Sequence, residues 1–173
     1  MIRIRAAGRA DAQAIGKVHV ETWRDAYAGI LPDRVLLKMS ADVEGGRWVR
    51  ALERRARVLV AEDAHGRIVG FGSCGRARGS ALSFAGEVYT LYVLPDCQGV
   101  GIGRRLLGAL FDTLEKTGHG SALIWVLQEN PSRFFYEAMG GRYVADREER
   151  LWGTVVTEAA YGWDSLSIPC STR

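Results

Sequence analysis

The chain has 173 residues, 47% hydrophobic and 25% charged, which is enough for one domain with a sizeable core. No run of about 18 apolar residues is present to span a membrane, and a net charge of +3 is too small to indicate nucleic-acid binding. The three cysteines are widely spaced and odd in number, and no apolar leader follows the N-terminus. These features predict free thiols and a cytoplasmic address, without membrane or nucleic-acid partners.

The first half of the chain reads as one strand, three helices and a strand hairpin. Alternating apolar and charged residues indicate strands, and apolar residues at helical spacing indicate helices. The expected elements are a strand at 2–5, helices at 11–28, 32–39 and 40–52, and strands at 58–62 and 68–74.

The second half begins with a loop rich in small residues and alternates strands with helices. The expected elements are a loop at 75–86, a strand at 87–93, a helix between Gly103 and Gly118, a strand at 122–127, a helix at 131–139, and strands at 143–151 and 154–163. This order predicts an α/β (α+β) fold, a mixed sheet covered by helices on both faces. We expect a single domain at 1–166 and a tail at 167–173.

Three alternate glycines, Gly99, Gly101 and Gly103, separate the strand at 87–93 from the next helix. Glycines let the backbone approach a ligand closely, and the first amides of a helix have no partner within it. The positive end of the helix dipole favours an anion by about 0.3–1 kcal/mol, and Arg104 and Arg105 add charge. The turn is therefore predicted to bind a phosphate.

Two common phosphate-binding motifs do not fit this turn. A dinucleotide-binding Rossmann motif needs a following strand that closes with an acidic residue, whereas these glycines lie past the middle of the chain and the strand at 122–127 closes with Leu127. A P-loop needs a Gly-Lys-Ser/Thr triplet, which is also missing. The glycine turn therefore belongs to another class of phosphate site.

Three sequence motifs resemble the GNAT superfamily of N-acetyltransferases. The first is Leu91-Tyr92-Val93-Leu94-Pro95 followed by Gln98-Gly99-Val100-Gly101-Ile102-Gly103. The second is Asn130 followed by Phe134-Phe135-Tyr136-Glu137-Ala138-Met139-Gly140, and the third is the run from Glu21 to Pro32. The resemblance covers nearly the whole chain. It implies a GNAT-like, mostly antiparallel central sheet that is splayed at the cofactor site.

The resemblance implies that acetyl-CoA is the cosubstrate and that no metal takes part. The backbone of Leu91, Tyr92 and Val93 would pair with the pantetheine arm, and Asn130 would contact the cofactor. The pyrophosphate would be held by Gly99, Val100, Gly101, Ile102, Gly103 and Arg104, and Gln98, which can orient the turn, would also belong to the cofactor site.

The implied reaction is direct transfer of the acetyl group to a primary amine of a small molecule or peptide. Tyr136 would bind the cofactor sulfur and protonate it, since a phenol (pKa about 10) is only slightly weaker than a thiol (about 8.5). Some members carry a glutamate five residues before the asparagine, where this chain has Trp125. We therefore take Glu87 as the candidate general base. Trp23 and Tyr27, four residues apart on one helix face, are candidates for the acceptor site.

Each assignment has a structural alternative. Tyr136, Trp23 and Tyr27 could be core aromatics, Asn130 a helix cap, and Glu87 a structural carboxylate. At the level of function, the alternatives are an acyl-CoA-binding sensor without turnover and a nucleotide-binding protein. The sequence leaves open the acceptor, the use of other acyl groups, and whether the protein is a monomer or a homodimer.

Overall fold

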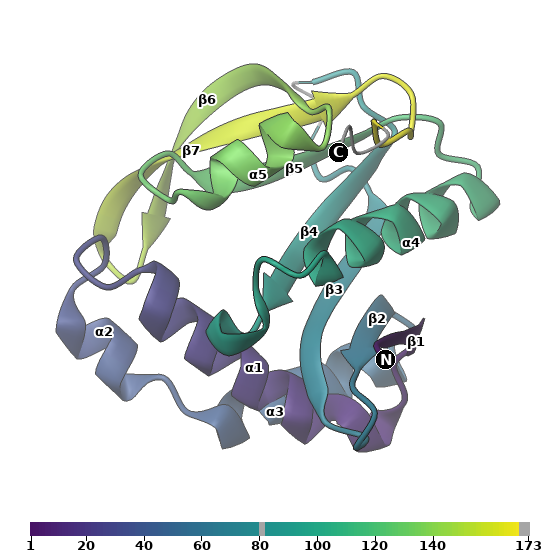
Figure 1. Cartoon of the computed structure of the whole chain (residues 1–173). Helices are drawn as coiled ribbons and strands as arrows, with labels where there is room; N and C mark the ends of the chain where they lie inside the picture. Colours follow the sequence, from purple (N-terminus) through teal and green to yellow (C-terminus); the bar gives the residue numbers. More distant parts are fainter. Residues whose placement is uncertain (80–81, 170–173) are drawn as a thin grey trace. The chain divides into compact units, whose positions relative to one another are not determined.

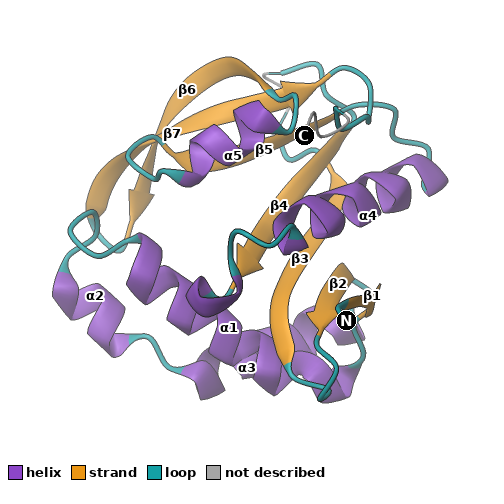
Figure 2. Cartoon of the chain, viewed as in Figure 1, coloured by secondary structure: helices purple, strands orange, loops and turns teal. Residues whose placement is uncertain are grey.

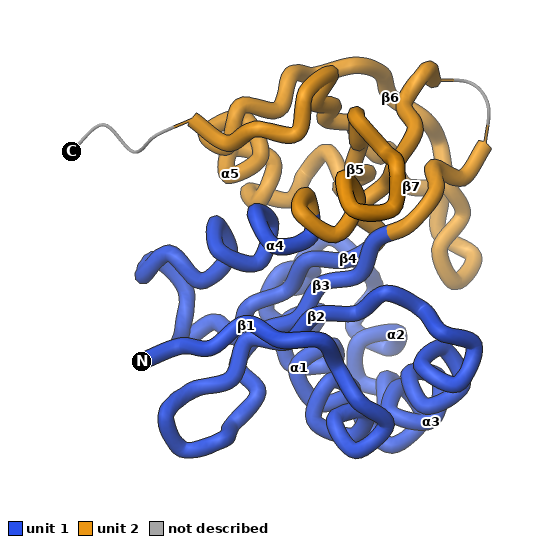
Figure 3. The backbone as a smooth tube through the Cα atoms, turned by 90° about the vertical axis from the view of Figure 1, so that its right-hand side faces the viewer, with its two compact units in different colours: residues 1–74, 90–110 blue, residues 75–89, 111–173 orange. Residues whose placement is uncertain are grey.

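The computed structural model describes residues 1–79 and 82–169. It divides into two compact units, each made of two chain segments (Figure 3). Unit 1 comprises Met1–Cys74 and Thr90–Leu110, and unit 2 comprises Gly75–Tyr89 and Phe111–Arg173. The single domain at 1–166 stays a prediction, and residues 170–173 of the expected tail lie outside the described part of the chain.

Seven strands form one sheet in the order β1-β2-β3-β4-β5-β7-β6 (Figure 1). Their bounds are β1 Arg3–Ala6, β2 Arg57–Glu62, β3 Ile68–Arg76, β4 Gly86–Val93, β5 Ala122–Leu127, β6 Arg142–Leu151 and β7 Thr154–Trp163. β4 and β5 pair in parallel, whereas β1/β2, β2/β3, β5/β7 and β6/β7 are antiparallel. The predicted mixed, mostly antiparallel sheet is confirmed.

The helices agree closely with the sequence pattern (Figure 2). Their bounds are η1 Arg9–Asp11, α1 Ala12–Ala26, α2 Asp33–Lys38, α3 Ala41–Glu53, η2 Pro95–Cys97, α4 Ile102–Lys116 and α5 Ser132–Ala138. Among these described elements, η1 and η2 are short 3₁₀ turns that the pattern did not predict. Ser40 caps α3, as its hydroxyl accepts a hydrogen bond from Val43 N at 3.5 Å. Within the described residues, no helix combines the length and apolarity needed to cross a bilayer.

Around the predicted site, the element boundaries differ from the prediction in two regions, the β3–β4 connection and the start of α4. The expected loop at 75–86 is shorter, because β3 continues through Arg76 and β4 begins at Gly86. Gly75 leaves room for the ring of Tyr89, whose hydroxyl donates to the Arg76 carbonyl at 2.5 Å. α4 begins at Ile102 rather than after Gly103, because Arg105 N already bonds to the Gly101 carbonyl at 3.1 Å.

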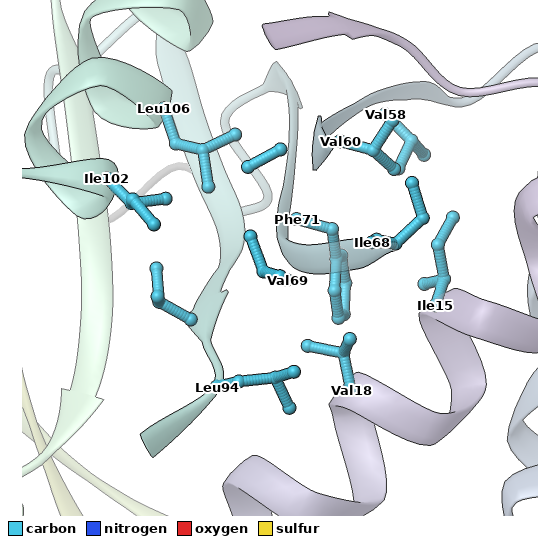
Figure 4. Close-up of a cluster of buried hydrophobic side chains, with 12 residues drawn as sticks. Ile15, Val18, Val58, Val60, Ile68, Val69, Phe71, Leu94, Ile102 and Leu106 are labelled. Atoms are coloured by element: carbon cyan, nitrogen blue, oxygen red, sulfur yellow. The ribbon is translucent and has the colours of Figure 1, made fainter. Parts of the chain in front are cut away.

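Unit 1 has helices on both faces of β3 (Figure 4). Phe71 is fully buried and packs edge-on against Trp48 of α3, at 5.0 Å between ring centroids. Neighbouring residues of a strand point to the opposite face, where a Cβ at Gly72 would lie only 2.6 Å from Leu110 of α4. Gly72 therefore allows α4 to pack closely on this face.

Unit 2 has a smaller core between α5 and the strands β5, β7 and β6 (Figure 1). Tyr136 of α5 lies against Tyr161 and Trp163 of β7, with ring centroids 6.4 Å apart in each case. Trp163 also donates its indole N–H to the Met139 carbonyl at 3.0 Å, which ties the end of α5 to β7. These contacts fix α5 on one face of the three strands.

Candidate functional site

The glycine-rich turn lies in unit 1 and has an open backbone. Gly99 (φ +77°) and Gly101 (φ +85°) are both in the left-handed region that disfavours other residues. A Cβ built on either glycine would have no heavy atom within 4 Å, so the space beside both is empty. Val100 between them is 74% exposed. The turn therefore presents an uncovered stretch of main chain to solvent.

The start of α4 follows this turn directly. The bond from Arg105 N to Gly101 O is the first i,i−4 bond, so Ile102 and Gly103 precede the bonded part of the helix. Arg104 lies in the same first turn. The Arg105 guanidinium instead donates to the Ile2 carbonyl at 2.9 Å and anchors α4 to the N-terminal segment. Arg104 stays the arginine that the motif predicts to bind the cofactor.

The end of β4 supplies two residues with outward-facing main-chain groups. The Tyr92 carbonyl lies on the β3 side, 2.9 Å from where a Cβ of Gly70 would be. Because main-chain groups of neighbouring strand residues point to opposite edges, those of Leu91 and Val93 point away from β3. Gln98 Nε2 donates to the Val93 carbonyl at 2.9 Å and joins the turn to the strand. Leu91 and Val93 are thus better placed than Tyr92 to pair with an extended ligand.

The candidate acceptor-site residues belong to an aromatic row on α1. Trp23 and Tyr27 pack edge to face at 4.6 Å, and His19, one turn earlier, lies 5.5 Å from Trp23. The His19 ring stacks on Tyr92 at 5.5 Å between centroids and 24° between planes. Tyr27 is only 7% exposed, so its ring contributes to the core as well. The row joins α1 to the same part of β4 that the motifs single out.

The His19 side chain is 15% exposed and is held as a neutral imidazole. Desolvation, followed by the charge of Arg47, lowers the pKa of His19 from 6.5 to about 4. Glu44 lies 3.5 Å from Nδ1 and would favour the charged form, but it is already paired with Arg47 at 2.9 Å. Trp48 Nε1 donates to the same Nδ1 at 3.3 Å, and only the neutral ring can accept this bond.

The candidate residues of the second motif lie in unit 2. Tyr136 is 4% exposed and Asn130 is 6% exposed. Asn130 Oδ1 accepts a hydrogen bond from Ser132 N at 2.9 Å, so the asparagine does shape the turn into α5. The Tyr161 hydroxyl beside Tyr136 donates to Glu137 at 3.0 Å, and burial, followed by this bond, raises the pKa of Tyr161.

Glu87 is also in unit 2, and both of its carboxylate oxygens are occupied. Oε2 accepts from the Arg78 amide at 2.8 Å, and Oε1 accepts from Arg78 Nη2 at 2.7 Å and Nε at 3.2 Å. The Glu87 side chain is only 2% exposed. A proton from a substrate would have to displace one of these hydrogen bonds to reach Glu87. The contacts favour the structural alternative for this residue.

Four further polar residues were not singled out from the sequence. Arg78 holds Glu87, and His19 extends the row of Trp23 and Tyr27; its position four residues before Trp23 was a usable signal. Arg147 and Glu158 form a pair across β6 and β7, with Arg147 stacked over Trp125. Their pairing follows once the hairpin turn is placed at Trp152–Gly153.

The described residues contain no group of three or more side chains suited to hold a metal ion. Cys74 and Cys97 are free thiols. Burial raises the pKa of Cys74 to about 11, and burial, followed by a hydrogen bond to Asp96, raises the pKa of Cys97. Both thiols therefore favour the protonated, poorly nucleophilic form.

Comparison with known proteins identifies the family. Residues 54–140 match the family described as the acetyltransferase (GNAT) domain. The chain is 34% identical over 168 residues to the uncharacterized N-acetyltransferase YuaI of Bacillus subtilis, covering 96% of this chain and 95% of that protein. The chain therefore belongs to the GNAT family and is an acyltransferase, as the motifs predicted.

Two further relatives agree with this assignment. The [ribosomal protein bS18]-alanine N-acetyltransferase of Haemophilus influenzae is 34% identical over 73 residues, or 42% of this chain and 47% of that protein. The structure of yncA from Salmonella typhimurium, described with its cofactor acetyl-CoA, aligns with a TM-score of 0.70 at 22% identity and covers 100% of this chain and 98% of that chain. The predicted GNAT-like fold is confirmed.

Proposed function

We propose that this protein transfers an acetyl group from acetyl-CoA directly to a primary amine of a small molecule or peptide. The observation that carries the proposal is the open turn at Gly99 and Gly101, whose left-handed backbone leaves empty space beside the first turn of α4. A phosphate fits such a turn, because helix N-termini and exposed amides bind anions. Acetyl-CoA bound there would supply an activated acyl group as a thioester.

The residues that would hold acetyl-CoA fit its chemistry in three places. Residues 98–104 would bind the pyrophosphate through main-chain amides and Arg104. The main-chain groups of Leu91 and Val93, which point away from β3, would pair with the pantetheine arm. β4 also pairs with β5 only at Gly86–Ala122 and Glu87–Leu123, the first two residues of each strand. The family resemblance implies a sheet that is splayed at the cofactor site, and the short β4–β5 pairing supports this expectation.

In unit 2, Asn130 would contact the cofactor and Tyr136 would act on its sulfur. The Tyr136 phenol would donate a hydrogen bond to the sulfur and release its proton as the thiol departs. The raised pKa values of Cys74 and Cys97 favour direct transfer over a thiol-bound intermediate.

The acceptor is an amine in this proposal, with Trp23 and Tyr27 at its binding site. The name of the Haemophilus relative supports this class, because it specifies an alanine of a ribosomal protein. A cytoplasmic address fits the free thiols of Cys74 and Cys97.

Release of free thiol from acetyl-CoA across a panel of amines tests the proposal. Wild-type protein should release thiol with at least one amine, and Tyr136→Phe should lower kcat by about 10²- to 10⁴-fold, as loss of a general acid does. Binding of acetyl-CoA, measured by calorimetry, should be unchanged in that variant. Tyr143→Phe, which removes a 54% exposed phenol on β6, is the matched control. Protein that binds acetyl-CoA but never releases thiol would instead be a sensor.

A further inference from the structure

A second arginine–glutamate pair lies on the strands that follow α5 in unit 2. The β6–β7 register places Arg147 opposite Glu158. Arg147 Nε donates a hydrogen bond to Glu158 Oε2 at 2.7 Å, and Nη2 forms an ion pair with the same oxygen at 2.7 Å. Its guanidinium also lies 4.0 Å from the centre of the Trp125 ring. Glu158 is therefore fixed beside Trp125, the position where some family members carry a glutamate.

Glu158 and Tyr136 lie on opposite faces of β5 and β7. Tyr136 packs against Tyr161 and Trp163, and residues alternate between faces along a strand. Glu158 is an odd number of residues from both and therefore faces the other way. Trp125 is on the Glu158 face, because Arg147 touches both side chains. An acid on one face and a carboxylate on the other suit a reaction that protonates a leaving group and deprotonates a nucleophile.

Within the described residues, Glu87 and Glu158 differ in whether a carboxylate oxygen remains without a hydrogen bond. Both oxygens of Glu87 accept hydrogen bonds from Arg78, and the side chain is 2% exposed. In Glu158 only Oε2 is bound, and Oε1 has no hydrogen-bond partner among residues 1–79 and 82–169. The Glu158 side chain is 15% exposed, compared with 38% for Arg147. Glu158 thus combines a fixed position with an oxygen that can accept a proton.

The charges around Glu158 come from β6 and from the segment between β3 and β4. Arg147 of β6 is its direct partner, and Glu149 lies 4.0 Å from Arg147. Arg78, between β3 and β4, has its pKa raised by Glu87 first and by Glu158 last. Arg147 is therefore the contacting partner of this carboxylate, and Arg78 adds a second positive charge to its surroundings.

Trp125 stands two residues beyond the last β4–β5 pair, Glu87–Leu123. β5 therefore continues beyond its last pair with β4, and the ring of Trp125 on this continuation lies beneath the Arg147 guanidinium. We infer that Glu158, positioned by Arg147, is the proton acceptor for the attacking amine, in place of Glu87. This inference rests on the proposed function.

The step balances in atoms and charge. The amine nitrogen forms a bond to the acetyl carbon and loses one proton to Glu158 Oε1, directly or through a water molecule. The carbon–sulfur bond breaks, and the sulfur takes a proton from Tyr136. The proton on Glu158 returns to the Tyr136 phenolate through solvent, so the products are an amide and a free thiol.

Glu158→Gln tests this assignment, because glutamine can still accept the hydrogen bond from Arg147 Nε. Thiol release is measured with an α-amine and an ε-amine between pH 7 and about 10.5, a range that spans the ordinary pKa values of both amines, about 8 and about 10.4. We expect kcat to fall about 100-fold at pH 7, with unchanged acetyl-CoA binding. The loss should be larger for the ε-amine and should shrink as pH rises, because solvent then removes the proton. A purely structural role would not produce this dependence on the amine and on pH.

Three comparisons complete the experiment. Glu148→Gln changes an exposed neighbour on β6 and should leave turnover as it is. Arg147→Lys keeps the carboxylate but loses the guanidinium that holds it, and it should lower kcat less than Glu158→Gln without changing the pH dependence. If wild type and Glu158→Gln release thiol at the same rate, the assignment is overturned while the proposed function stands. The same conclusion follows if only Glu87→Gln loses activity. If wild type releases no thiol with any amine, both are overturned.

Discussion

Unit 1 uses glycine in two opposite ways. Where α1 crosses α3, a Cβ at Gly16 would lie 2.5 Å from both the Ala41 carbonyl oxygen and Gly45 N. At the turn before α4, a Cβ at Gly99 or Gly101 would touch nothing within 4 Å. The first glycine is needed because main chain fills the space beside it. The other two have positive φ and leave their space empty.

This difference distinguishes a glycine needed for helix packing from a glycine that leaves room for a ligand. A glycine whose side-chain space is occupied allows two helices to approach each other, and its loss affects stability. A glycine whose space is empty leaves room for a group from outside the chain, and its loss should affect the ligand more than the fold. Sequence alone shows glycine in both places. Substitutions can therefore test whether the two regions really differ in this way.

The largest expected change in stability is a loss at acid pH, and it comes from the largely enclosed His19, where α1 packs against α3. Its pKa is about 4 in the folded chain compared with 6.5 ordinarily. Between these values the unfolded chain binds a proton that the folded chain does not. The free energy of unfolding should therefore fall as pH drops from 6.5 to 4, by about 3 kcal/mol in total.

Urea unfolding of wild type and His19→Asn over this pH range measures the effect. Carboxylates also contribute to acid unfolding, so the difference between the two proteins isolates the histidine. The difference should shrink steadily as pH falls, because only wild type loses this stabilisation. Parallel curves would mean that His19 titrates alike in both states.

The next effect is the direct substitution Gly16→Ala. The new methyl group would meet main-chain atoms that cannot rotate away, so α1 and α3 must separate. After allowing for the better helix propensity of alanine, we expect a loss of about 2 kcal/mol, measured by urea unfolding. Gly46→Ala on α3 is the matched control, because its nearest contact would be Arg50 Nη1 at 3.9 Å. It should raise stability by about 0.5–1 kcal/mol. Equal effects of the two substitutions would contradict the packing role of Gly16.

Much of the fold could be predicted because the apolar patterns in the sequence agree with the strands and helices that pack in the core. The apolar run at 122–127 is β5 and the range 154–163 is β7, with the predicted bounds in both cases. α4 begins at Ile102, two residues earlier than expected, because the Gly101 carbonyl already serves as the first acceptor of the helix. Periodicity finds the middle of a helix, but the first bonded residue depends on turn geometry.

The candidate site was less predictable where the hydrogen-bond partner of a side chain comes from a segment between strands. Glu87 was identified from its place on a strand, but Arg78, which binds both of its oxygens, comes from the segment between β3 and β4. No periodicity predicts that contact. The Arg147–Glu158 pair was accessible in principle, because a two-residue turn at Trp152–Gly153 sets the register. Residue types predict a cofactor site at 98–104. Only long-range contacts show that, among the described residues, Glu158, and not Glu87, keeps a carboxylate oxygen without a hydrogen bond.

The smallest expected change in stability belongs to the open turn, and there the ligand gives the clearer result. Gly101→Ala forces a side chain into the left-handed region at φ +85° and should cost about 1 kcal/mol. Gly66→Ala is a close match, since Gly66 has φ +79° and also has no atom within 4 Å of a built Cβ. Both variants should lose similar stability in urea unfolding. Only Gly101→Ala should weaken acetyl-CoA binding in calorimetry, by about tenfold or 1.4 kcal/mol, because its methyl group would occupy the space proposed for the pyrophosphate. If both variants bind acetyl-CoA like wild type, the empty space beside Gly101 is not where the cofactor lies.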